Sequence, residues 1–419
     1  MHPPDPNRLL MIAYHYPPVR HSSGIQRTLK FSSYLRDHGW EPMILTVSPR
    51  AYELVSEDQM GEIPPGMIVE RAFGLDTSRH LSIGGRYLGW MAQPDRWVSW
   101  WPAAVWRGLR MIRKHRPKVI FSTYPIATAH LIGYTLSKLT GVPWIADFRD
   151  SMTEPGYPSD PTTWKIHRWL EKKFVRRCTH AVFTTQGTRE MYAERYPDID
   201  PGKWVVIENG FDEENFRQAE AGFTPAPLGK PGQLTLIHSG LLYPQERDPR
   251  PFFAALRDLR QAGEITPDDL QVVLRATGSD ELYAPLLADF GLTDIVRLAP
   301  TVGYQAALRE MLSADGLLLF QATMCNHQIP AKLYEYLRAG KPALTLTDPV
   351  GNTAEAMRQA GANDIVDIRD ANDIAGGLRK FIAALRAGSV RGIPPTTAAA
   401  HSRRSRTNEL AALLGRLKI

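Results

Sequence analysis

The feature of this chain that most limits its fold is the alternation of short apolar segments with longer amphipathic ones. Leu9–Tyr14 is a continuous apolar run, Ile25–His38 has apolar residues at helical spacing, and Glu41–Thr46 is apolar again. A short apolar run is typical of a strand buried on both faces, and two such strands joined by a helix form a parallel pair. The sequence therefore predicts an α/β protein built on parallel sheets.

The alternation occurs in two successive series, which indicates two domains. The first series continues with predicted strands at 118–123, 143–147, 181–185 and 203–207, and with predicted helices at 127–140 and 167–177. The second series has predicted strands at 234–239, 270–275, 295–298, 316–320 and 342–347, and predicted helices at 251–261, 284–290, 304–313 and 331–339. The chain has 419 residues, and a single hydrophobic core stops growing at roughly 250–300 residues.

The domain boundary is predicted near Pro225, because residues 219–232 are rich in Pro, Gly and Ala and have little periodicity. We expect an N-terminal domain at 1–218, this linker, and a C-terminal domain at 233–398. Residues 399–419 are predicted to form a helix that packs back on the N-terminal domain. Two doubly wound, Rossmann-like domains facing each other would enclose a cleft lined by the carboxyl ends of their strands.

Composition and charge narrow the classes of function. Cys178 and Cys325 are far apart and lack metal-ligand spacing, so a reducing compartment is expected. The net charge of +6 favours anionic partners, and no nucleic-acid-binding motif is present. No N-terminal signal and no apolar run of about 18 residues is found, so we expect a protein that is cytoplasmic or peripheral at the inner face of the membrane.

Three candidate sites lie in the first half. Gly24 follows a loop after the first strand and precedes a helix, where free amides attract phosphate; the alternative is a structural turn. Asp147–Asp150 ends a strand where ligands bind in such sheets, although an Asp147–Arg149 ion pair would explain it equally. His130 lies near the start of a predicted helix and is expected at the cleft edge, where it would donate to a sugar hydroxyl or carry a proton. The alternative is a packed histidine.

Two further candidate sites lie in the second half. Ser239 and Gly240 end a strand, and Arg247 supplies a guanidinium suited to a diphosphate, unless it pairs on the surface with Asp248. The segment Gln328–Pro342 carries the most weight. Pro330 suits the first turn of a helix, whose amides together with Lys332 form an anion site. Glu335 lies one turn further on the same face, where it can accept both ribose hydroxyls or simply pair with Lys332.

Together these segments resemble the retaining family-four glycosyltransferases of the GT-B fold. The resemblance runs from about Leu9 to about Asp367 and rests on five motifs in order, which contain Pro17–Arg27, Asp147–Asp150, Asn209–Asp212, His238–Tyr243 and Pro330–Pro342. It implies that Gly24 lies beside the donor and that His130 points at the transferred sugar. It also implies that Arg247 and Lys332 neutralise the diphosphate, that Glu335 holds the ribose, and that no metal or other cofactor is needed.

The chain departs from the family pattern at two positions. Gln328 stands where the family commonly has a glutamate, and an amide can hydrogen-bond sugar hydroxyls but cannot act as a base. The basic residue that commonly follows the glycine segment directly is absent, and we assign Arg247 in its place. The candidate catalytic residues are therefore His130 and Asp150. The candidate donor-binding residues are Gly24, Ser239, Gly240, Arg247, Gln328, Pro330, Lys332, Leu333 and Glu335.

The segment 87–116 combines five tryptophans with many basic residues. Such a composition suits an anionic membrane surface or a lipid-linked acceptor, and equally a helix with tryptophans on its buried face. The predicted function is a hexosyltransferase-like enzyme that moves a sugar from a nucleotide diphosphate sugar to a polysaccharide or lipid-linked oligosaccharide, with retention. The alternatives are a sugar-nucleotide epimerase on the same fold and a non-catalytic sugar-nucleotide-binding or assembly protein.

Overall fold

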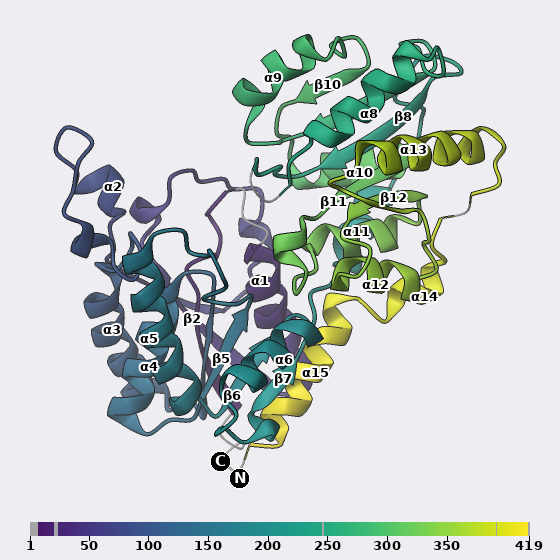
Figure 1. Ribbon diagram of the computed structural model, residues 1–419. Coiled ribbons are helices and arrows are strands. Elements are labelled where there is room, and N and C mark those ends of the chain that lie inside the picture. Colours follow the sequence, from purple (N-terminus) through teal and green to yellow (C-terminus); the bar gives the residue numbers. More distant parts are fainter. Residues whose placement is uncertain (1–6, 21–23, 245–246, 391, 418–419) are drawn as a thin grey trace. The chain divides into compact units, whose positions relative to one another are not determined.

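The computed structural model of the chain describes residues 7–20, 24–244, 247–390 and 392–417. The chain forms two compact units, one of Met1–Glu208 with Arg403–Ile419 and one of Asn209–Ser402. Each unit contains one sheet of parallel strands with helices on its faces (Figure 1). The predicted α/β class with two Rossmann-like domains is therefore confirmed.

The first unit is built on a seven-stranded sheet in the order β3-β2-β1-β4-β5-β6-β7. Its strands are β1 (Asn7–Ile12), β2 (Trp40–Val47), β3 (Ile68–Ala72), β4 (Val119–Thr123), β5 (Trp144–Arg149), β6 (His180–Phe183) and β7 (Trp204–Val206). The central strands are almost fully buried, as expected of a parallel sheet covered on both faces. The order reverses at β1, so the loops after β1 and β4 meet at the switch point where such sheets bind ligands.

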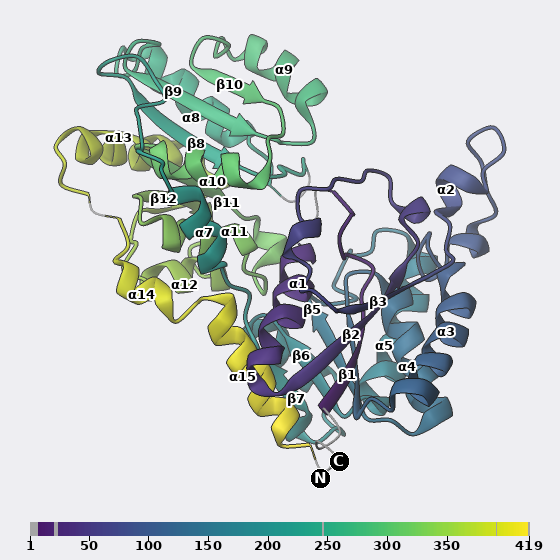
Figure 2. The ribbon, with the colours of Figure 1, turned by 180° about the vertical axis from the view of Figure 1, so that it is seen from behind.

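Helices cover both faces of this sheet. They are α1 (Gly24–Tyr34), α2 (Thr77–His80), α3 (Trp100–His115), α4 (Ala127–Thr140), α5 (Pro161–Arg177), α6 (Gln186–Arg195) and α15 (Arg403–Gly415). Helices α3, α4 and α5 lie side by side on one face, and α1 and α15 pack together on the other (Figures 1 and 2). Helix α5 begins six residues before its predicted start, because Asp160 caps it and Pro161 occupies its first turn.

The second unit is built on a six-stranded sheet in the order β10-β9-β8-β11-β12-β13. Its strands are β8 (Leu234–Ser239), β9 (Leu270–Arg275), β10 (Val296–Ala299), β11 (Gly316–Phe320), β12 (Ala343–Thr347) and β13 (Ile365–Asp367). Its helices are α7 (Glu213–Glu220), α8 (Arg250–Gln261), α9 (Asp280–Asp289), α10 (Tyr304–Ser313), α11 (Ala331–Ala339), α12 (Asn352–Gln359), α13 (Ala371–Arg386) and α14 (Pro395–Ala399). The strand order again reverses at a central strand, β8, so the β8 and β11 carboxyl ends form its switch point.

The structure moves the predicted domain boundary from Pro225 to the end of the first unit at Glu208. Helix α7, predicted to belong to the first domain, packs on α10 of the second unit and buries Phe216 there. The guanidinium of Arg338 pairs with both Glu213 and Glu220 and so holds α7 in place. The predicted linker 219–232 is therefore a surface segment inside the second unit. The chain returns to the first unit with α15.

Candidate active site

The candidate site of the second unit is centred on the first turn of α11. Lys332 and Glu335 lie on one face of this helix, and the Lys332 ammonium is 3.1 Å from Oε2 of Glu335. The hydroxyl of Tyr304, at the start of α10, donates to Oε1 of the same carboxylate at 2.9 Å. The two partners hold the half-buried Glu335 carboxylate in one orientation. Because each of its oxygens has two lone pairs, it can still accept hydroxyl donors.

Gly240 directly follows β8 and lies beside the Lys332 side chain of this pair. Its φ of +145° is one that side-chain-bearing residues rarely adopt, and a Cβ built there would lie 3.1 Å from Cε of Lys332. Glycine at this position therefore lets the backbone and the lysine side chain approach each other. The preceding amide of Ser239 is held by the hydroxyl of Tyr336, which accepts from it at 3.3 Å. The structure thus brings together Ser239, Gly240, Lys332 and Glu335, as the sequence predicts.

His238 precedes these residues and is buried beneath them. Its Nδ1 is 2.9 Å from the carbonyl oxygen of Leu318, so this nitrogen carries the proton and donates. Its Nε2 has no hydrogen-bond partner among the described residues. Burial lowers the pKa of His238 to about 4, and the positive charges of Arg247 and Lys332 lower it further against the opposing bond to Leu318. The imidazole is therefore neutral near pH 7, with an accepting nitrogen beside Gly240.

The Arg247 side chain lies at the same end of the sheet, where it contacts the segments that follow β8 and β11. Its Nε donates to Oε1 of Gln321, which follows β11, at 3.2 Å, and one terminal nitrogen donates to the carbonyl of Leu241. The predicted surface pair with Asp248 does not form, because Asp248 pairs with Arg250. Residues 245–246, between Tyr243 and Arg247 in this motif, lie outside the described residues.

The first turn of α11 has no side-chain cap. Pro330 is the residue that caps the helix, one position before the predicted first turn, and it offers no side-chain acceptor to the first amides. Leu333 is buried and its amide donates to the Pro330 carbonyl, so it supports the turn through packing. The backbone of Gln328 is held on both sides, by the carbonyl of Cys325 and the hydroxyl of Thr353. The open amides and Lys332 form the kind of anion site that helix N-termini provide.

In the first unit, the structure overturns the expectation that His130 lies at a cleft edge. Its side chain is fully buried, and rings of Tyr124, Trp144 and Phe148 surround it. Its Nδ1 lies 2.7 Å from the hydroxyl of Ser122. Burial lowers the pKa of His130 to about 3. The alternative of a packed histidine is therefore the right one, since this position of α4 faces the sheet.

The structure also gives Asp147 a different partner from the predicted Arg149. Arg27 of α1 binds both carboxylate oxygens of Asp147, with N–O distances of 3.0 and 2.8 Å, and both side chains are buried. Thr123 donates to the same carboxylate at 2.8 Å. This pair ties α1 to β4 and β5 at the carboxyl end of the sheet.

Arg149, the last residue of β5, makes contacts other than the predicted pair with Asp147. It has a φ of +60°, and the pairing of β5 with β6 shifts register between Asp147 and Arg149. Its guanidinium donates to the carbonyl of Tyr124, and its buried Nε has no partner among the described residues. Burial, then the charge of Arg149, lowers the pKa of His15 to about 3. Such strained backbone is common at ligand sites.

Asp150 and Gly24 lie at the same end of the first sheet. Asp150 directly follows β5 and is half-buried, and Gly24 is the buried first residue of α1. Residues 21–23 of the predicted anion-binding loop before Gly24 lie outside the described residues. The structure therefore places Asp150 and Gly24 at the edge that the sequence predicts, without defining a ligand contact for either.

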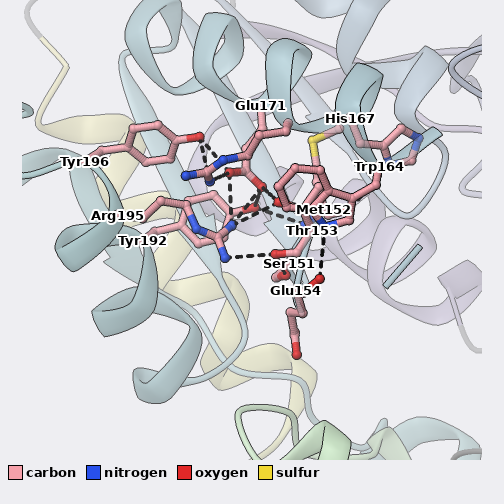
Figure 3. A network of polar contacts seen from close by, with 11 residues as sticks. Ser151, Met152, Thr153, Glu154, Trp164, His167, Glu171, Tyr192, Arg195 and Tyr196 are labelled. Atoms are coloured by element: carbon pink, nitrogen blue, oxygen red, sulfur yellow. Dashed lines mark hydrogen bonds and ion pairs between the residues drawn. The ribbon is translucent and has the colours of Figure 1, made fainter. Parts of the chain in front are cut away.

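A buried polar network fixes the segment that follows Asp150 (Figure 3). The fully buried carboxylate of Glu171, on α5, accepts from Thr153, Tyr192 and Tyr196. Arg195 forms an ion pair with Glu171 and also donates to the Thr153 carbonyl at 2.8 Å. Because the network joins α5, α6 and residues 151–154, it keeps the carboxyl end of β5 in one conformation.

The tryptophans of the segment 87–116 fall into two groups. Trp100 is fully buried, Trp97 packs on Tyr14, and Trp101 donates to Thr135 at 3.0 Å. Trp90 and Trp106 are exposed. For Trp97, Trp100 and Trp101 the alternative of a buried face is therefore correct.

Residues 24–210 match the family model described as a glycosyl transferase 4-like domain. A comparison with curated protein sequences gave no significant match.

Solved structures similar to this chain confirm the GT-B fold. Anabaena HepE in complex with UDP superposes with a TM-score of 0.67 over 98% of this chain and 100% of that one, at 14% identity. The lipopolysaccharide outer core galactosyltransferase WaaB gives 0.63 over 98% and 100%, at 11% identity. The UDP-GlcNAc 2-epimerase from Neisseria meningitidis gives 0.56 over 98% and 100%, at 10% identity.

Several residues of the candidate site were missed from the sequence. His238 stood in a selected motif but was not chosen, although it directly precedes Ser239 at the end of β8. Tyr304 and Gln321 could not be recognised as site residues from the sequence, because their contacts with Glu335 and Arg247 join segments that are far apart in the chain. In the part of the chain that the structure describes, no cluster of metal-ligating side chains occurs, and no helix is long and apolar enough to cross a bilayer.

Proposed function

We propose that this chain transfers a sugar from a nucleotide diphosphate sugar to a polysaccharide or lipid-linked oligosaccharide acceptor, with retention of configuration. The observation that carries the proposal is the cluster at the start of α11. There Lys332 and the uncapped amides of the first turn lie beside the half-buried carboxylate of Glu335 and the partly exposed Gly240. A cation at a helix N-terminus suits a diphosphate, and a fixed carboxylate suits a pair of ribose hydroxyls. The structural similarity to HepE, which was solved with UDP and with UDP-glucose, supports this donor class.

In this proposal the second unit stabilises the leaving group. As the bond between the sugar C1 and the β-phosphate oxygen breaks, negative charge grows on the diphosphate. Lys332, Arg247 and the α11 amides would stabilise that charge without needing a metal ion. The acceptor hydroxyl oxygen bonds to C1, and its proton passes to the leaving phosphate. Gln328 would hydrogen-bond hydroxyls of the sugar, and its amide cannot act as a base.

The first unit would receive the acceptor. Its candidate groups are Asp150 and Arg149 at the carboxyl end of β5, and His130 is withdrawn because it is buried in the core. A location at the cytoplasmic face of a membrane, in contact with anionic lipid, is part of the proposal. It follows from the basic charge and exposed aromatic residues of this unit.

Calorimetric titration with UDP tests the donor site. We expect Lys332→Ala and Glu335→Ala each to weaken UDP binding at least about tenfold, which corresponds to about 1.4 kcal/mol. Lys380→Ala, which removes an exposed cation elsewhere in the second unit, should leave the affinity unchanged. Circular dichroism should show that all three variants are folded. Unchanged affinity in both site variants would overturn the site assignment.

A turnover assay separates the proposed activity from its alternatives. With UDP-glucose or UDP-N-acetylglucosamine and no acceptor, a transferase should release UDP slowly, and added acceptor should accelerate the release. Formation of an epimeric UDP-sugar would instead show an epimerase, the activity of one structural neighbour. Binding without turnover on any acceptor would show a non-catalytic binding protein.

A further inference from the structure

The helical layer α3–α5 of the first unit has an unusual concentration of positive charge. These three adjacent helices contain eleven Lys and Arg residues and one acidic residue, Glu171. Glu171 is fully buried, so it contributes no charge to the outer surface. The layer therefore carries more net positive charge than the whole chain, whose formal charge is +6.

Most of the cations in this layer are not neutralised by ion pairs. Arg107, Arg168 and Arg176 pair with carboxylates. Eight others are at least partly exposed and form no ion pair with a described residue; they are Arg110, Arg113, Lys114, Lys138, Lys165, Lys172, Lys173 and Arg177. On the opposite face of the unit, by contrast, Arg404 pairs with Asp37 and Arg406 with Glu409. Most of the cations on the outer face of α3, α4 and α5 are therefore not balanced by a nearby carboxylate.

Large apolar side chains lie exposed among these cations. Trp106 on α3 is 55% exposed, Trp169 on α5 is 60% exposed, and Leu139 on α4 is 62% exposed. Arg110 lies 4.8 Å over the Trp106 ring, and Lys173 lies 4.6 Å over the Trp169 ring. One face of each indole is therefore covered by a cation.

We propose that the outer face of α3, α4 and α5 docks on an anionic lipid bilayer. Indoles at the depth of the headgroups, surrounded by Lys and Arg that reach lipid phosphates, are the features that bind proteins to such surfaces. Figure 1 shows the three helices side by side, so their cations act on the same surface. A nucleic acid fits these observations less well, because the exposed Leu139 suits the apolar part of a bilayer but offers a base no ring on which to stack.

The outer face of α3, α4 and α5 lies partly outside the segment in which the sequence predicts a membrane contact. Within 87–116, only the exposed side of α3 takes part, since Trp100 is buried. The contact adds α5, which the sequence did not connect with α3, because the two helices are separated by α4 and about 50 residues of chain. Lipid docking does not require the proposed sugar transfer, although it would bring the first unit to a lipid-linked acceptor.

Sedimentation of the full chain with vesicles tests the proposal. We expect binding to vesicles of phosphatidylglycerol with phosphatidylcholine, little binding to phosphatidylcholine alone, and a steep loss of binding with salt. The double variant Arg113→Glu/Lys172→Glu should lower partitioning at least about 25-fold, because each surface cation contributes about fivefold. Its control, Arg297→Glu/Lys380→Glu, changes two exposed cations of the second unit by the same total charge. The control should lose less than about threefold.

A second pair of variants tests the tryptophans. Trp106→Ala/Trp169→Ala should lower partitioning about tenfold, whereas Trp90→Ala, which removes an exposed tryptophan outside this face, should change it by less than about twofold. Calorimetric UDP binding by every variant separates this test from that of the proposed activity. Equal losses in the face variants and their controls would overturn the proposal. So would failure to bind anionic vesicles, or binding of double-stranded DNA in preference to them.

Discussion

The buried pair of Arg27 and Asp147 allows a prediction of stability with a matched control. The Asp147 carboxylate has no exposed surface and accepts two bonds from Arg27 and one from Thr123. In Asp147→Asn the amide keeps the shape but leaves the buried guanidinium without a counter-charge. Breaking such a pair costs about 3–5 kcal/mol. The control, Asp198→Asn, breaks an ion pair with Arg176 whose carboxylate is 60% exposed, and this should cost about 0–1 kcal/mol.

Urea unfolding followed by tryptophan emission measures this difference in the first unit alone. All ten tryptophans of the chain lie in that unit, at positions 40, 90, 97, 100, 101, 106, 144, 164, 169 and 204. With an m-value of about 3 kcal/mol/M, the midpoint should fall by about 1–1.7 M for Asp147→Asn and by less than about 0.3 M for Asp198→Asn. Equal shifts for the two variants would refute the assignment of a buried, uncompensated Arg27.

Three further predictions follow from the same structure. In the folded chain His130 stays neutral until the pH falls to its pKa of about 3, whereas in the unfolded chain it gains a proton below about pH 6.5. The free energy of unfolding therefore falls as the pH drops through this window. His130→Gln should reduce the slope of the free energy of unfolding in urea against pH, between pH 6 and 4, by about 1.4 kcal/mol per pH unit. Gly240→Ala should strain the backbone by about 1–3 kcal/mol and weaken UDP binding in calorimetry, whereas Gly376→Ala, which meets nothing within 4 Å, should not. Trp100→Ala should cost about 3–5 kcal/mol by urea unfolding and Trp106→Ala less than about 1 kcal/mol; similar losses would contradict the buried and exposed assignments.

The candidate donor site was the part most open to prediction. Helix α11 begins and ends at the predicted residues, since Pro330 and Gly340 mark its limits locally. The Lys332–Glu335 pair follows from a spacing of three residues in a helix. Tyr304, which holds the same carboxylate, could not be predicted, because no periodicity relates the start of α10 to α11.

The site of the first unit was less predictable, again because its contacts join segments that are far apart in the sequence. A histidine near the start of a helix can face either the sheet or the solvent, and only the packing of α4 on Trp144 and Phe148 showed that His130 is buried. Asp147 has a basic neighbour two residues away, yet its partner is Arg27, 120 residues distant. The docking of α1 on the sheet decided between these two arginines.

The sequence by itself determined the alternation of strands and helices, the two parallel sheets, and the turn of α11 that carries Lys332 and Glu335. These features depend on periodicity and on turn residues within a few positions of each other, so local physics suffices. Only the tertiary structure decided which side chains are buried, which charges are paired, and where the division between the units lies. Those properties depend on contacts between distant segments, such as Arg338 of α11 with Glu213 and Glu220 of α7. The basic face shared by α3 and α5 exists for the same reason, because folding places two separate helices in one layer.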